Sequence, residues 1–135
     1  MSNKSLIQSK GFHPFGDLIG LNFTKVEAGY SRCVLEVNKK LLNPYNFLHG
    51  GAIYSMADTG MGGALSLLLD QNELCATVEI KISYFVPVSS GKLTCDTRVV
   101  HRGKKIATLE SEVKQNETLV AKAIGTFLIY AVSKD

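Results

Sequence analysis

Residues 52–69, AIYSMADTGMGGALSLLL, decide the fold of this chain, because these eighteen positions hold a single charge, Asp58. A helix of this length spans about 27 Å at 1.5 Å per residue. Glycines and hydroxyl residues dilute its apolarity and no anchoring residues flank it, which argues against a membrane span. We therefore expect a helix that is buried on nearly all sides of a globular fold. Its glycines lower helix stability, so they predict the close approach of another segment.

Alternating apolar and polar residues predict strands on both sides of this helix. Two precede it, at residues 21–27 and 31–38, and four follow it, at residues 77–86, 92–101, 105–115 and 119–131. In the second strand Cys33, Leu35 and Val37 share one face. Short connections between the last four strands favour antiparallel meander pairing. This order predicts the α+β class, with a long antiparallel sheet of about six strands wrapped around one central apolar helix.

Length and composition favour a single intracellular domain. The chain has 135 residues, and we expect an N-terminal arm or short helix at 1–17 and one domain at 18–135. Its net charge of +3 is too small to indicate nucleic acid as a partner. The three cysteines show no CxxC spacing and the start lacks a signal-peptide pattern, so we expect a cytoplasmic protein that has reduced cysteines and no membrane contact.

Sequence motifs for metals and common cofactors are absent. Histidines and carboxylates do not cluster at metal-ligand spacing, and there is no phosphate-binding loop, dinucleotide fingerprint or GxSxG motif. We therefore expect neither a metal nor a cofactor.

Candidate chemistry gathers around the central helix. Asn43 lies in the preceding loop, His49 and Gly50 open the helix, Asp58 lies inside it, and Thr77 begins the next strand. Glycines at a helix start leave backbone N–H groups uncovered, where an anion or a developing oxyanion is stabilised; the alternative is a tight turn. A carboxylate in an apolar helix is costly unless it is paired or functional, so Asp58 is a candidate general base or nucleophile, or a structural aspartate.

The other polar residues each have two interpretations. His49 fits a substrate-orienting or hydrogen-bonded histidine better than a catalytic base. Asn43, which precedes a proline, is a turn former whose amide could also fix a water or a carbonyl. The Thr77 hydroxyl is expected to reach Asp58 or the water.

The spacing within the helix adds a constraint. Gly50 and Asp58 are eight residues apart, which places them about 12 Å apart along the axis. One carbonyl and its attacking water cannot easily meet both groups. Two such helices running antiparallel across a two-fold axis would bring them together, so we expect an active site shared between subunits.

The densest basic spot lies between two of the last strands. Arg102, Lys104 and Lys105 follow Arg98 on the preceding strand. They form either a solvated hairpin tip or a patch for the phosphate groups of a ligand.

A wider set of residues resembles the hotdog-fold acyl-CoA thioesterases, in particular the phenylacetate-degradation type and relatives of 4-hydroxybenzoyl-CoA thioesterase. The resemblance is carried by Asn43, the HGGA run at 49–52, the ADT run at 57–59, Gly62, TVEIKISYFVP at 77–87 and HRGKK at 101–105. It extends from about residue 21 to residue 130, which is nearly the whole chain. The combination of HGG, an aspartate nine residues beyond its histidine and a strand that ends in Tyr-x-x-Pro is fairly specific.

The resemblance implies a hotdog fold, dimers that join sheets edge to edge, and often homotetramers. It implies that Asp58 is the catalytic carboxylate and that the Gly50 N–H polarises the thioester carbonyl from the opposing subunit. It also implies that Asn43, His49 and Thr77 hold substrate or water. In relatives, basic residues near this hairpin contact the nucleotide of coenzyme A, which here suggests Arg102, Lys104 or Lys105.

The function expected is hydrolysis of acyl-CoA to a free carboxylic acid and CoA. Two alternatives stay open: a hotdog hydratase or dehydratase, whose usual Asp-x-Asn-x-x-His phrase is absent, and a non-catalytic acyl-CoA-binding protein. No motif defines the acyl pocket, so the acyl group is not assigned.

Overall fold

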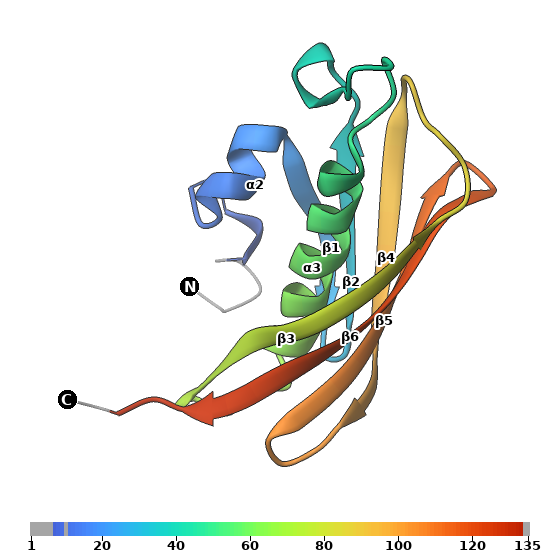
Figure 1. Ribbon diagram of the computed structural model, residues 1–135. Coiled ribbons are helices and arrows are strands. Elements are labelled where there is room, and N and C mark those ends of the chain that lie inside the picture. The colour runs from blue at the N-terminus through green and yellow to red at the C-terminus, as the bar shows by residue number, and fades with distance from the viewer. Residues whose placement is uncertain (1–6, 10, 134–135) are drawn as a thin grey trace.

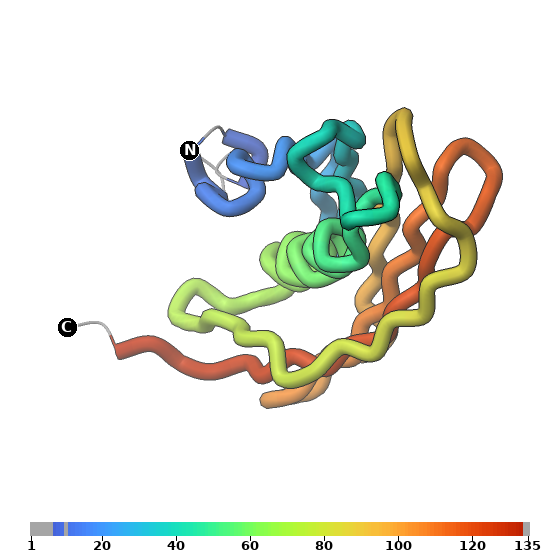
Figure 2. The backbone as a smooth tube through the Cα atoms, turned by 45° about the horizontal axis from the view of Figure 1, so that its top comes forward, coloured from blue at the N-terminus to red at the C-terminus, as the bar shows by residue number. Residues whose placement is uncertain are grey.

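A computed structural model describes residues 7–9 and 11–133. One long helix lies in the hollow of a curved antiparallel sheet (Figures 1 and 2). The helices are α2 (Pro14–Ile19), the 3-10 turn η1 (Lys39–Leu41) and α3 (Gly50–Ser66). The strands are β1 (Leu21–Glu27), β2 (Tyr30–Glu36), β3 (Glu73–Tyr84), β4 (Lys92–Arg102), β5 (Ile106–Gln115) and β6 (Thr118–Ala131). This confirms the α+β arrangement, a six-stranded sheet around one helix. The expected N-terminal arm lies partly outside the described residues.

The strand order differs from a simple meander. The sheet runs β1-β2-β4-β5-β6-β3 with every pair antiparallel, so β4, β5 and β6 form a meander but β3 and β4 are not neighbours. The predicted hairpin between those two strands is wrong because β2 and β5 already occupy both edges of β4. The connection at residues 85–91 crosses the end of the fold instead, where Leu48 N–H bonds the Val88 carbonyl at 2.7 Å.

Helix α3 starts and stops earlier than its apolar run. It begins at Gly50 because the His49 side chain accepts a hydrogen bond from Gly51 N–H and caps the first turn. It ends at Ser66 because the Leu68 and Leu69 N–H groups bond carbonyls three residues back, which closes the helix in a turn. The expected span of 52–69 was therefore displaced toward the C-terminus.

On the side of α3 that faces the sheet, side chains of the strands pack directly against the helix. Cys33 and Leu35 face the helix and are fully buried, as the alternation in that strand predicts. At Gly60, an added Cβ would lie 2.6 Å from Thr97 Oγ1. At Gly63, it would lie 2.5 Å from the Phe23 ring. These two glycines confirm the predicted close approach of other segments.

The opposite side of α3 is not closed in this way. Asp58, Thr59, Gly62 and Ser66 keep intermediate exposure, so the expectation of a helix buried on nearly all sides was wrong for this stripe. Among the described residues, no helix is both long and apolar enough to cross a bilayer.

Candidate active site

Asp58 and Thr77 meet between the middle of α3 and strand β3. The Thr77 hydroxyl donates a hydrogen bond to Asp58 Oδ1 at 2.7 Å, which confirms the expected contact. The register of β3 against β6 shifts just after Thr77, which pairs with Phe127 and therefore points toward the helix. Among the described residues, Thr77 is the one hydrogen-bond partner of Asp58, so its second carboxylate oxygen can accept a proton from water.

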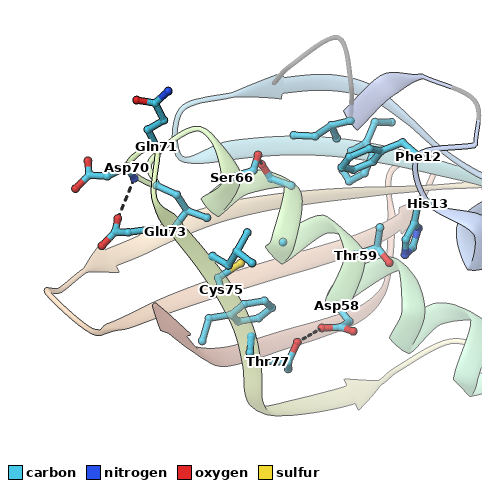
Figure 3. A pocket seen from close by; sticks show the side chains of 18 residues that line it. Phe12, His13, Asp58, Thr59, Ser66, Asp70, Gln71, Glu73, Cys75 and Thr77 are labelled. Atoms are coloured by element: carbon cyan, nitrogen blue, oxygen red, sulfur yellow. Dashed lines mark hydrogen bonds between the residues drawn. The ribbon is translucent and has the colours of Figure 1, made fainter. Parts of the chain in front are cut away.

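These two residues border a cavity of about 640 Å³. Figure 3 shows Asp58 and Thr77 at one end and Asp70, Gln71 and Glu73 at the other. The volume lies within the range of about 300–1,000 Å³ that small-molecule sites occupy.

The negative charge of Asp58 acts on the Cys75 thiol. Burial raises the pKa of Cys75, and the negative charge of Asp58 raises it further. Cys75 lines the same cavity. A neutral thiol there is an apolar wall and not a nucleophile.

At the start of α3, the carbonyl and the N–H of the peptide group between Gly50 and Gly51 are both hydrogen-bonded. Gly51 N–H donates to His49 Nδ1 at 2.7 Å, and the Tyr84 hydroxyl donates to the Gly50 carbonyl at 2.8 Å. Within the described chain, no group accepts the Gly50 N–H. His49 acts as a cap through Nδ1, which leaves its Nε2 as a donor. The peptide between Gly50 and Gly51 is thus fixed, whereas the Gly50 N–H has no hydrogen-bond acceptor in the described chain.

Tyr84 is a site residue that sequence reasoning missed. Its ring carbons and hydroxyl lie 3.3 Å from the position of a Cβ on Gly50, and its burial raises its pKa, with Tyr54 adding to the effect. Tyr84 is the tyrosine of the Tyr-x-x-Pro phrase, but its position in the sequence could not predict that its side chain contacts the first turn of α3.

Asn43 forms the loop before the helix. Its side-chain oxygen accepts hydrogen bonds from Tyr45 N–H at 2.9 Å and Phe47 N–H at 3.1 Å. The turn-forming interpretation is therefore correct. Its side-chain NH₂ remains a donor that can meet a carbonyl or a water.

The two halves of the predicted site do not meet within one chain. Gly50 and Asp58 both lie on α3, eight residues apart, so about 12 Å of helix separates them. One half offers a backbone donor at the helix start, and the other offers a carboxylate with its hydroxyl partner.

The four basic residues of the predicted spot differ in their interactions. The Arg102 guanidinium binds Glu73 Oε1 at 2.6 Å and also donates to backbone carbonyls of its own hairpin. Lys104 and Lys105 are exposed. Arg98 lies over the Tyr30 ring at 5.1 Å on the outer face of the sheet. Over residues 7–9 and 11–133, no three His, Cys, Asp or Glu side chains group as metal ligands.

Comparisons with known proteins identify the family of this chain. The sequence pattern of the thioesterase superfamily matches residues 45–122. A Saccharolobus solfataricus protein provisionally named an esterase is 36% identical, over 84% of this chain and 76% of that protein. The Klebsiella pneumoniae proofreading thioesterase EntH is 29% identical, over 68% and 67%. The Listeria monocytogenes 1,4-dihydroxy-2-naphthoyl-CoA hydrolase is 25% identical, over 72% and 79%.

Solved structures share the whole architecture. A conserved Pseudomonas aeruginosa protein superposes with a TM-score of 0.84 at 30% identity, covering 96% of this chain and all of that one. A variant of the Thermus thermophilus phenylacetic acid degradation protein PaaI gives 0.80 at 25% identity, covering 86% and 98%. The chain therefore belongs to the thioesterase superfamily. It has the hotdog fold and is a thioester hydrolase.

Proposed function

We propose that this protein hydrolyses acyl-CoA to a free carboxylic acid and CoA. The observation that carries the proposal is the Asp58–Thr77 pair on the wall of a cavity of suitable size. The name of the Listeria monocytogenes relative supports a CoA thioester as the substrate.

In the proposed reaction, Asp58 acts as a general base on a water molecule that Thr77 helps to position. The water oxygen attacks the thioester carbonyl carbon while its proton passes to Asp58. The Gly50 N–H of the opposing subunit, assisted by Asn43 and His49, stabilises the oxyanion. The intermediate collapses as the C–S bond breaks, and the CoA thiolate takes up a proton. Tyr84 acts as a positioning residue, because it fixes the peptide that follows the oxyanion donor.

Asp58 could instead attack the carbonyl as a nucleophile, and a single turnover in ¹⁸O water separates the two roles. A general base gives labelled acid in the first turnover. A nucleophile first forms a mixed anhydride and releases CoA. Attack of water on the Asp58 carbonyl carbon of that anhydride gives unlabelled acid and a labelled enzyme. Attack on the acyl carbon gives labelled acid, and CoA release that precedes acid release in the same turnover then identifies the nucleophile.

The test of the function is thiol release from a panel of short, long, branched and aromatic acyl-CoAs, with Asp58→Asn alongside. We expect turnover by the wild type and a loss in the variant of about 10²–10⁴-fold in kcat, with an unchanged circular dichroism spectrum. Tight acyl-CoA binding with no turnover on any member would contradict the proposal and favour a binding protein.

The proposed assembly is a homodimer through the β3 edges, with two dimers forming a homotetramer. β3 is an edge strand of the sheet and carries exposed apolar side chains, including Leu74 and Val78. An open apolar edge invites pairing with another strand. The outer face of β6 is also apolar, at Ile124 and Leu128, and would serve the contact between dimers. Light scattering in solution gives the mass directly.

A complementation experiment tests whether Gly50 and Asp58 of one active site come from different subunits. Co-expressed Gly50→Pro and Asp58→Asn protomers form mixed dimers, each with one intact site if Gly50 and Asp58 come from different subunits. Random mixing then restores about a quarter of wild-type activity. A site contained in one subunit would restore none.

Lys104 and Lys105 are proposed to contact the CoA phosphates, whereas the charge of Arg102 is already balanced by Glu73. Lys104→Ala combined with Lys105→Ala is expected to raise KM for acyl-CoA and leave kcat unchanged. An unchanged KM would contradict this assignment.

A further inference from the structure

Gly62 is the glycine of α3 that packing does not explain. A Cβ at Gly60 would meet Thr97, and a Cβ at Gly63 would meet Phe23, so both are glycine because neighbours come close. A Cβ at Gly62 would meet no atom within 4 Å in the described structure. A glycine inside a helix is less stable than an alanine. The missing side chain at Gly62 therefore leaves space that this chain does not use.

That space belongs to the cavity beside Asp58. Asp58, Gly62 and Ser66 follow one another at four-residue intervals and all line the cavity, so they form one stripe along α3. Strand β3 forms the facing wall from Thr77 to Glu73. The stripe from Asp58 to Ser66 is about 12 Å long, which is roughly the length of an extended chain of eight to ten carbons.

The walls of this groove differ between its middle and its far end. Figure 3 shows Cys75 between the two ends, and Phe23 and Phe127 also line the cavity, so its walls suit hydrocarbon. Asp70 and Glu73 lie at the far end, and Figure 3 shows them together there. Glu73 is paired with Arg102, and it also accepts a hydrogen bond from Asp70 N–H at 2.9 Å. Among the described residues that line the cavity, no lysine or arginine is present to meet an anionic tail.

We propose that this cavity is the acyl groove, that Gly62 keeps it open one helix turn beyond the reacting carbon, and that the enzyme prefers uncharged apolar acyl chains of about eight to ten carbons. The inference rests on the proposed thioesterase function. It adds the substrate class and the residue that sets chain length. A side chain at position 62 blocks the groove near its start, and one at position 66 blocks it near its end.

The experiment measures kcat/KM for straight-chain acyl-CoAs from acetyl to palmitoyl, together with ten-carbon ω-carboxyacyl-CoA. We expect a wild-type maximum at about eight to ten carbons and discrimination against the carboxylate-ended chain. Gly62→Val should lower kcat/KM for decanoyl-CoA by about 100-fold and change that for acetyl-CoA by about threefold or less. Ser66→Val should reduce activity only for the longer chains. Thr94→Val, on the outer face of β4, is the matched control with an unchanged profile.

Each outcome separates this inference from the function itself. No turnover of any acyl-CoA by the wild type overturns the proposed function. Normal turnover with an unshifted profile in Gly62→Val overturns the inference alone. If Gly62→Val fails to fold, the smaller Gly62→Ala replaces it and should give a weaker shift in the same direction. Loss of assembly in Gly62→Ala, seen by light scattering, would show that a partner subunit fills this space and would also overturn the inference.

Discussion

The side of α3 that faces β2, β4 and β5 is filled by contacts, whereas the side that faces β3 borders an open cavity. On the filled side, the Ser31 hydroxyl donates to the Gly60 carbonyl at 2.6 Å, and Thr97 and Ser111 share a buried hydrogen bond at 2.7 Å. On the open side, Asp58 bonds Thr77, and a Cβ added at Gly62 would meet no atom of the described residues within 4 Å.

The difference shows how one helix serves two purposes. The three hydroxyl residues of the filled side are fully buried and bonded, which fixes the position of the helix on the sheet. Asp58 then keeps a constant position without close packing around it. Substitutions on the filled side should change stability, and substitutions along the open side should change catalysis.

After Asp58→Asn, replacing Gly50 gives the largest expected effect, and it falls on catalysis. Gly50→Pro removes the N–H at the first helical position, where proline is tolerated, and we expect kcat to fall by about 10²–10³-fold. Gly50→Ala keeps the N–H and adds the same Cβ near Tyr84, so it is the matched control. Steady-state kinetics give kcat for both variants. Equal losses in both variants would show that the Tyr84 contact, and not the N–H, is responsible.

Two alanine substitutions compare the sides directly. Gly60→Ala places a Cβ 2.6 Å from Thr97 Oγ1. Overpacking costs about 1–3 kcal/mol, so the free energy of unfolding should fall despite the better helix propensity of alanine. Gly62→Ala meets nothing and should raise the free energy of unfolding by up to about 1 kcal/mol. Urea denaturation measures both. The comparison fails if the two changes have the same sign.

Tyr84→Phe removes one hydrogen bond from the fixed peptide at the start of α3. A hydrogen bond of this kind contributes about 1 kcal/mol, so we expect kcat to fall about fivefold while KM is unchanged. Tyr30→Phe, which removes a hydrogen bond to Asp96 on the outer face of the sheet, is the control. A change in KM alone would assign Tyr84 to substrate binding instead of positioning.

The smallest effect is expected at the Arg32–Asp96 pair on the outer face of the sheet, where Nε and Oδ1 are 2.8 Å apart. Burial raises the pKa of Asp96, but hydrogen bonds from Arg32 and Tyr30 outweigh it and leave the pKa below its ordinary value. A lowered pKa in the folded state stabilises the protein above the ordinary pKa, and this contribution is lost as pH falls through the lowered one.

Arg32→Ala should therefore lower the free energy of unfolding by less than about 1 kcal/mol at neutral pH, because solvent screens this partly exposed pair. The difference from wild type should shrink in acid, and kcat should not change. Urea denaturation at the two pH values tests the sign. A destabilisation that grows in acid would contradict it.

Much of the fold could be predicted because it depends on local pattern. Period-two alternation located the six strands, and the apolar run located α3. Errors arose where the outcome depends on distant neighbours. The end of α3 at Ser66 and the start of β3 at Glu73 are set by turn closure and by the length of β6, which pairs as far as Ala131.

The site divides in the same way. Asp58, Gly50 and Thr77 could be selected because their chemistry shows in residue type and spacing. Tyr84 and the pairing of Arg102 with Glu73 could not, because both contacts join strands to segments far away in the sequence.

The sequence alone determined the helix, the alternating strands, and the eight-residue separation of Gly50 from Asp58, because backbone geometry converts spacing directly into position. Only the tertiary structure decided that β3 pairs with β6 at the sheet edge, and which glycines of α3 are covered. Gly60 and Gly62 are equivalent in the sequence pattern. They differ because Thr97 reaches the first across the fold, while no residue in the described part of the chain comes within 4 Å of a Cβ at the second.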